Sequence, residues 1–84
     1  SYSQTACYSK QKIVPYLKKE FNEFHFWTGV DAISKTELNM YVNPKTGTFT
    51  ITLTPPQDLT VECVLVGGKD FSFPKQTEKE GVDS

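Results

Sequence analysis

The spacing of apolar residues early in the chain predicts one amphipathic helix. Apolar side chains recur every three or four positions, which places them on one helical face. They are Ile13, Leu17, Phe21 and Phe24. Ser9 is a suitable N-cap, and the opposite face carries lysines and glutamates up to Glu23. Pro15 removes one early backbone hydrogen bond, so the helix either kinks there or begins near it. We expect about four turns, ending near Phe24.

Two runs of alternating apolar and polar residues predict a β-hairpin. The apolar residues are Leu38, Met40 and Val42 in the first run, and Phe49, Ile51 and Leu53 in the second. Residues 43–47 lie between the runs and have the composition of a tight turn, in which Pro44 presets φ and Gly47 takes the left-handed position. We expect both apolar rows to face the helix and the threonines of residues 48–54 to face solvent.

Two further extended segments complete the predicted sheet. Residues 25–33 are irregular, whereas residues 59–66 place Val61, Cys63 and Leu65 on one face. Phe71 and Phe73 are candidates for a short edge segment. The chain is therefore expected to form an α+β domain over residues 1–74, with one N-terminal helix on a three- to four-stranded antiparallel meander. Residues 75–84 are polar and are expected to form a flexible charged tail.

Size and charge exclude several classes of partner. The 84 residues are enough for one domain. Nine basic and ten acidic residues leave a net charge of −1, which offers no electrostatic footprint for nucleic acid. No apolar run approaches the roughly 20 residues of a membrane span. We therefore predict no nucleic-acid binding and no membrane insertion.

The two cysteines, Cys7 and Cys63, are either a disulfide or two buried thiols. A structural metal site needs three or four ligands, and the single His25 does not supply the balance. A disulfide would tie the start of the helix to the last long strand. An oxidised pair indicates a periplasmic or extracellular protein. The chain opens with Ser1 rather than Met, which fits a removed signal peptide or an artificial boundary.

The sequence carries no catalytic, metal or cofactor signature. Cys7 and His25 lie at opposite ends of the predicted helix, about 25 Å apart, so they do not form a nucleophile–base pair. The carboxylates Asp31, Asp58 and Asp70 fall in predicted turns or strand ends, where aspartate is common for local reasons. A minimal hydrolase that uses such turn carboxylates is the alternative hypothesis.

Three aromatic residues are candidates for a partner-binding patch. Phe26 and Trp27 are adjacent in the chain, and Tyr41 lies on the first strand of the predicted hairpin. Aromatic side chains are enriched in interface hot spots. They are equally suited to covering the end of a small core, and both interpretations stay open.

A larger pattern extends from the first cysteine to the paired glycines. Cys7 precedes the amphipathic helix, residues 38–51 read LNMYVNPKTGTFTI, and residues 63–68 read CVLVGG. This arrangement resembles a group of small exported proteins of unknown function from marine alphaproteobacteria and their phages. Those proteins share an N-terminal cysteine, a TGTWTI-like strand and a second cysteine five residues before a glycine. Phe49 stands here in place of the tryptophan.

The resemblance implies export and a disulfide, and it implies no activity. Together with the absence of a catalytic signature, it predicts a small exported or phage-encoded interaction or accessory protein. Its partner is expected to be a protein.

Overall fold

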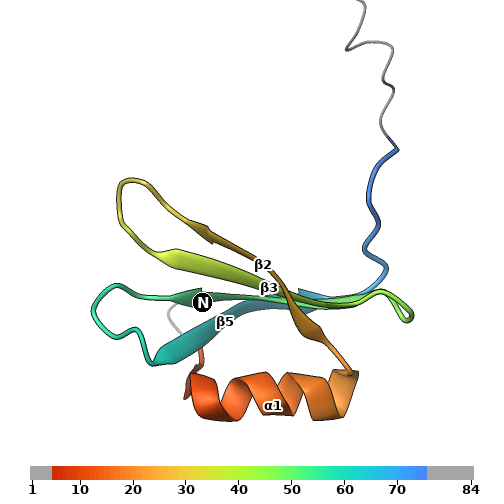
Figure 1. Ribbon diagram of the computed structural model, residues 1–84, viewed down its shortest axis with the longest axis horizontal. Helices are drawn as coiled ribbons and strands as arrows, with labels where there is room; N and C mark the ends of the chain where they lie inside the picture. The colour runs from red at the N-terminus through yellow and green to blue at the C-terminus, as the bar shows by residue number, and fades with distance from the viewer. Residues whose placement is uncertain (1–4, 76–84) are drawn as a thin grey trace, which may run out of the picture.

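One α-helix packs on one face of a five-stranded antiparallel sheet (Figure 1). The computed structural model describes residues 5–75. The elements are β1 (Cys7–Ser9), α1 (Lys10–Phe21), β2 (Phe24–Val30), β3 (Glu37–Asn43), β4 (Thr48–Thr54) and β5 (Val61–Gly68). Their order in the sheet is β1-β5-β4-β3-β2. The predicted α+β class and antiparallel sheet are therefore confirmed.

The length of α1 matches the distance between the two edges of the sheet. β1 and β2 are the outermost strands, and α1 connects them. Five strands spaced about 4.8 Å apart are about 19 Å wide, and a helix of 12 residues is about 18 Å long. The helix therefore crosses the sheet from edge to edge. Its buried residues Ile13 and Leu17 form a small apolar cluster with Tyr41 and Val64.

The helix ends earlier than predicted because its C-terminus is capped at Asn22. Asn22 adopts the left-handed conformation with a φ of 53°, and its amide donates a hydrogen bond to the Lys18 carbonyl at 3.0 Å. Asn43 Nδ2 donates to the carbonyl of Phe21 at 2.9 Å. The prediction of a helix that includes Phe24 is therefore wrong, and that residue begins β2.

The predicted hairpin turn is confirmed. β3 and β4 pair in register up to Asn43 opposite Thr48. The Asn43 carbonyl accepts a hydrogen bond from the Gly47 amide at 2.8 Å, and its Oδ1 accepts one from the Lys45 amide at 2.9 Å. Gly47 has a φ of 80°, a conformation that glycine adopts without steric cost.

The sheet has more strands than the predicted three to four. β1 has three residues and too few positions to show alternation, so only its pairing with β5 defines it. β2 covers the irregular segment 25–33 only as far as Val30, and it has a bulge between His25 and Trp27. Phe71 and Phe73 form no strand. All but Lys75 of the predicted tail lies outside the described residues.

The hairpin turns its threonine face, and not its apolar face, towards α1, which is the reverse of the prediction. Thr50, Thr52 and Thr54 lie on the face that α1 covers, with exposed fractions of 7%, 0% and 0%. The apolar rows therefore lie on the opposite face. In the register of β3 and β4, Leu38 pairs with Leu53, Met40 with Ile51 and Val42 with Phe49. The expectation of solvent-facing threonines is wrong, since the side chains of a strand alternate between its two faces.

Candidate functional site

An open groove lies between α1 and the β1–β5 edge of the sheet. Its volume is about 810 Å³, and most of its lining is apolar or aromatic. The lining includes Tyr8, Lys12, Tyr16, Phe21, Val64 and Leu65. A concave apolar site of this size is suited to a small molecule or a short peptide segment.

Exposed aromatic side chains form the rim of this groove. Tyr8 and Tyr16 are 49% and 53% exposed, and Leu65 is 47% exposed. The rings of Tyr16 and Phe21 meet edge to face with centroids 6.1 Å apart. Apolar area therefore remains accessible on both the helix side and the strand side of the groove.

The groove opens along an incompletely paired strand edge. β1 pairs with β5 only over Val61–Cys63, and the Ala6 carbonyl then accepts a hydrogen bond from the Val64 amide at 2.9 Å. Among residues 5–75, no strand pairs with the outer edge of β5 from Leu65 to Gly68. An extended segment could pair with this edge while its side chains enter the groove.

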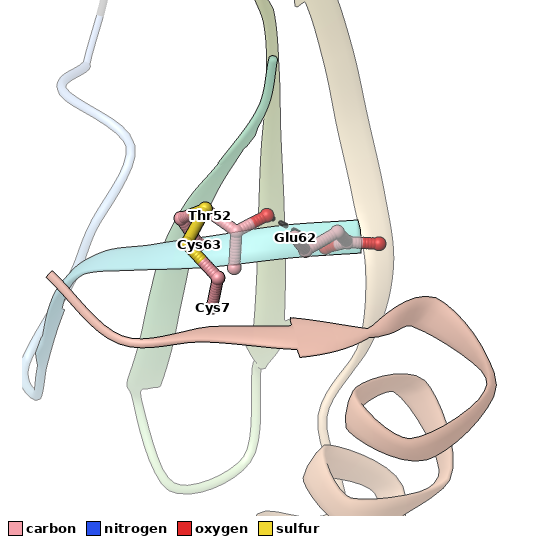
Figure 2. Close-up of a disulfide and its surroundings, with 4 residues drawn as sticks. All are labelled: Cys7, Thr52, Glu62 and Cys63. Carbon is pink, nitrogen blue, oxygen red and sulfur yellow. Dashed lines mark hydrogen bonds between the residues drawn. A yellow bond between two sulfur atoms is a disulfide. The ribbon is translucent and has the colours of Figure 1, made fainter. Parts of the chain in front are cut away.

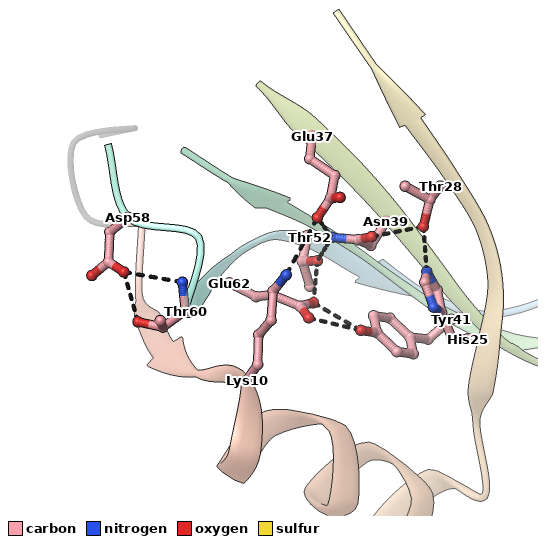
Figure 3. Close-up of polar contacts among 10 residues, drawn as sticks. All are labelled: Lys10, His25, Thr28, Glu37, Asn39, Tyr41, Thr52, Asp58, Thr60 and Glu62. Atoms are coloured by element: carbon pink, nitrogen blue, oxygen red, sulfur yellow. Dashed lines mark hydrogen bonds and ion pairs between the residues drawn. The ribbon is translucent and has the colours of Figure 1, made fainter. Parts of the chain in front are cut away.

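A buried polar cluster lies elsewhere between α1 and the sheet (Figure 3). Its centre is Glu62, which is 2% exposed. The Tyr41 hydroxyl lies 2.9 Å from both carboxylate oxygens of Glu62, and the Thr52 hydroxyl donates to Oε1 at 2.6 Å. Burial of a carboxylate is costly unless its oxygens accept hydrogen bonds, and these two hydroxyls supply them.

A directed series of hydrogen bonds connects Glu62 to the exposed His25. Asn39 Nδ2 donates to Thr52 Oγ1 at 3.4 Å, and Thr28 Oγ1 donates to Asn39 Oδ1 at 2.9 Å. Thr28 has a single hydroxyl proton, so at 2.6 Å it accepts a hydrogen bond from His25 Nε2. His25 therefore carries a proton on Nε2, and the series joins β2, β3, β4 and β5 (Figure 3).

The Tyr41 hydroxyl acts only as a hydrogen-bond donor. Burial, the hydrogen bond to Glu62 and the negative charge of that carboxylate raise the pKa of Tyr41 well above its ordinary value. The His25 ring also stacks on the tyrosine ring, with centroids 4.9 Å apart. Because the hydroxyl stays protonated at physiological pH, it is not a base or a nucleophile.

Two further glutamates connect the helical segment to the sheet. Glu37 Oε1 lies 3.4 Å from Nζ of Lys10, the first residue of α1. Glu23 is 2% exposed and accepts a hydrogen bond from Thr50 at 2.8 Å. The prediction that Glu23 faces solvent is wrong, because the helix ends before it and the chain then turns into the interior.

Thr52 and Thr54 offer a matched pair of substitutions on one strand face. Thr52→Val removes a donor to Glu62 and is expected to destabilise the fold by about 1–3 kcal/mol. The Thr54 hydroxyl is buried without a hydrogen-bond partner among the described residues. Thr54→Val is therefore expected to stabilise the fold by about 1 kcal/mol. Urea unfolding followed by circular dichroism measures both, and effects of the same sign would contradict the assignment.

The Cys7–Cys63 disulfide is present, with an S–S distance of 2.06 Å (Figure 2). It joins directly opposed residues of β1 and β5. Cys63 is 5% exposed, whereas Cys7 is exposed. Because β1 leads directly into α1, the bond ties the start of the helix to the sheet, as predicted. A disulfide fits a location outside the cytoplasm.

The predicted aromatic patch is not continuous. Phe26 and Trp27 are each 47% exposed on β2, but Tyr41 is 2% exposed beneath α1. Tyr41 belongs to the buried polar cluster, so its inclusion in an exposed patch is wrong. Phe26 instead contacts Phe73, with ring centroids 5.7 Å apart.

The turn carboxylates of the hydrolase hypothesis have local structural roles. Hydrogen bonds from the Ser34 hydroxyl and then the Ile33 amide lower the pKa of Asp31. Hydrogen bonds from the hydroxyl and then the amide of Thr60 lower the pKa of Asp58 (Figure 3). A general acid at neutral pH needs a raised pKa, so neither aspartate is suited to that role.

Residues 5–75 contain neither a candidate metal site nor a helix that could span a membrane. No group of three or more His, Cys, Asp or Glu side chains could hold a metal ion, and no helix is long and apolar enough to cross a membrane. Comparisons with known proteins do not assign the chain to a family. No protein-family model matches the chain, and no curated protein or solved structure matches it.

Sequence reasoning missed both the groove and the buried polar cluster. The groove joins α1 to β5, whose lining residues lie more than forty positions later in the chain, and no local pattern reports such a contact. The sequence contains one sign of the buried polar cluster. Glu62 lies inside a strand whose neighbouring residues are Val61, Cys63 and Val64, and a carboxylate in such a run needs hydrogen-bond donors from other strands.

Proposed function

We propose that this chain is a small exported interaction protein without catalytic activity, which binds an apolar segment of a partner protein in the groove between α1 and β5. The groove is the single observation that carries the proposal. It combines exposed aromatic side chains with a strand edge that no strand of residues 5–75 pairs with from Leu65 to Gly68. An extended segment would pair with the edge and place alternate side chains in the groove.

The charge of the lining favours one kind of segment. Lys12 lies at the groove and is exposed, whereas most of the other lining residues are apolar. An acidic residue beside the apolar side chains of the partner would meet this ammonium group. The preferred occupant is therefore an extended segment that combines aromatic or aliphatic residues with one acidic residue.

The state of the polar side chains supports a binding role over a catalytic one. The Glu62 carboxylate is buried and accepts hydrogen bonds from Tyr41 and Thr52, so it offers no free oxygen to a substrate. Asp31 and Asp58 are acceptors within their own turns. These side chains stabilise the fold, and the apolar groove remains available for a partner.

Export is the second part of the proposal. The disulfide supports a periplasmic or extracellular location, because thiols are kept reduced in most cytoplasms. The resemblance to small exported proteins of marine bacteria and phages points in the same direction.

Selection of peptides from a random displayed library against the immobilised, oxidised chain tests the groove. We expect enriched peptides to alternate apolar and small residues and to include an acidic residue. Tyr16→Ser and Leu65→Ser are each expected to weaken their binding about tenfold in calorimetric titration, since each removes apolar contact at the rim.

Leu59→Ser is the matched control for these variants. Leu59 is 64% exposed and does not line the groove, so its substitution is expected to leave the affinity unchanged. Equal affinities for the wild type and both groove variants would overturn the proposal. A loss of affinity in Leu59→Ser of the same size would do so as well.

A further inference from the structure

A continuous row of apolar side chains lies on the sheet face opposite α1. We define this outer face by the paired side chains of β3 and β4, which are Leu38, Met40, Val42, Phe49, Ile51 and Leu53. None of them carries a charge or a hydrogen-bonding side-chain group. Only Val42 among them is buried, with an exposed fraction of 2%, and the others are partly exposed.

The neighbouring strands extend the outer face. Trp27 lies beside Met40 from β2, and Val66 lies beside Ile51 from β5. Trp27 and Val66 are each 47% exposed. The apolar surface therefore continues over four adjacent strands.

Two glycines allow aromatic rings to lie flat against the outer face of the sheet. A Cβ atom on Gly29 would lie 2.8 Å from Cη2 of Trp27, and one on Gly68 would lie 2.8 Å from Cζ of Phe49. Both distances are too short for carbon atoms in contact, so each aromatic ring lies over the backbone of its glycine. Rings that lie along the sheet make a flat surface, which suits contact with another flat surface.

No described helix or strand covers the outer face. In Figure 1, α1 lies on one side of the sheet, and no other helix or strand of residues 5–75 lies over the opposite side. The segment after β5 stays near one end of the sheet, where the Phe71 amide donates to the Gly47 carbonyl at 3.1 Å. A sheet with an apolar face requires a second layer to cover it.

The remaining residues of the printed sequence are poorly suited to provide that layer. Residues 1–4 are Ser-Tyr-Ser-Gln, and residues 76–84 are Gln-Thr-Glu-Lys-Glu-Gly-Val-Asp-Ser. These segments offer only Tyr2 and Val82 as large apolar side chains, and the second contains four charged residues. Covering the outer face with them would bury charge against hydrocarbon.

We propose that a second copy of this chain covers the outer face, so that two sheets pack face to face in a symmetric dimer. Sheets of this kind pack about 10 Å apart with their strands nearly aligned. A two-fold axis places the same patch on both sides of the interface. Because the outer face is uncharged, two copies can meet without burying an unpaired charge. A charged partner surface would bury such a charge against this face.

The available area is sufficient for a dimer. Four strands that each occupy about 4.8 Å of width and are about seven residues long cover roughly 19 Å by 24 Å, or about 450 Å² in projection. The total surface buried on both copies is larger than twice this projected area, because side chains make the surface uneven. It reaches the lower end of the range for stable complexes, roughly 1,200 Å². The groove lies on the α1 side of the sheet, so it stays accessible in this dimer. The dimer proposal therefore does not depend on the proposed function.

Sedimentation equilibrium of the full oxidised chain tests the dimer. We expect a mass of twice 9.5 kDa that falls towards the single-chain mass on dilution. Ile51→Glu places a charge at the centre of the outer face and is expected to give a monomer. Val14→Glu is the matched control, because Val14 is 41% exposed on α1 and its substitution should leave the dimer intact.

A second measurement locates the interface without any substitution. In a mixture of isotope-labelled and unlabelled chains, intermolecular NMR contacts are expected from the methyl groups of Met40, Ile51 and Leu53. A single-chain mass at all concentrations overturns the proposal. A dimer whose intermolecular contacts come from α1, or one that persists in Ile51→Glu, overturns it as well. Vesicle binding by a chain that stays monomeric in solution would identify a lipid surface as the occupant instead.

Discussion

Reduction of the Cys7–Cys63 disulfide is expected to destabilise the fold by about 4 kcal/mol. The two cysteines are 56 positions apart, so the bond closes a loop that includes most of the chain. In the chain-entropy model, opening such a loop increases the conformational freedom of the unfolded state. For a domain of this size the loss corresponds to a decrease of roughly 15–30 °C in melting temperature. Thermal unfolding with and without reductant measures it.

The double variant Cys7→Ala/Cys63→Ala is the control for reduction. It should melt near the reduced wild type, and reductant should not change its melting temperature. Thiol titration of the denatured, unreduced wild type should find no free cysteine. Melting temperatures that agree within a few degrees before and after reduction would contradict the prediction. The support for a location outside the cytoplasm would then weaken as well.

Glu62→Ala is expected to destabilise the fold by about 3–5 kcal/mol, because it leaves two buried hydroxyls without their acceptor. Tyr41 and Thr52 both donate to the Glu62 carboxylate, and all three side chains are almost fully buried. The substitution also leaves a cavity beneath α1. Glu20→Ala on the exposed side of the helix is the matched control and is expected to change stability by less than about 0.5 kcal/mol. Urea unfolding followed by circular dichroism compares the variants.

Replacement of the whole cluster separates the lost acceptor from the lost packing. In the triple variant Glu62→Leu/Tyr41→Phe/Thr52→Val, the acceptor and both of its hydroxyl donors are removed together. Apolar replacement of both partners in a buried hydrogen bond can be nearly neutral, whereas removal of one partner is costly. The triple variant is therefore expected to be more stable than Glu62→Ala. A triple variant that is less stable would show that the unpaired hydroxyls are not the main cause of the loss.

The local elements of this protein could be predicted from its sequence, because short-range chemistry specifies them. The alternation on either side of residues 43–47 predicts the hairpin, and Asn43 and Gly47 supply the hydrogen bonds and the positive φ of its turn. The apolar spacing from Ile13 predicts the helix, although not its last turn. The sequence left open whether the two cysteines form a disulfide or stay as buried thiols. It did fix the pairing of any disulfide within the chain, because two cysteines can pair in only one way.

The candidate sites depend on contacts that no local pattern reports. The groove forms because α1 crosses to the far edge of the sheet while β1 pairs with only part of β5. The buried cluster forms because Tyr41 reaches Glu62, 21 positions away, and Thr52 reaches it across 10 positions. A period of two reveals that the residues of a strand alternate, but it does not reveal which set the helix covers.

Tertiary structure decided that question against the usual rule that the apolar row faces the helix. Threonine can be buried when its hydroxyl has a partner, and Glu62 and Glu23 provide acceptors for Thr52 and Thr50. These glutamates, together with Tyr41, make the polar face of the sheet compatible with α1. The apolar row then turns outward. The sequence by itself therefore determined the helix, the hairpin and the alternation of its strands. The hydrogen bonds between distant strands determined which face became the interior and which became the exposed apolar surface.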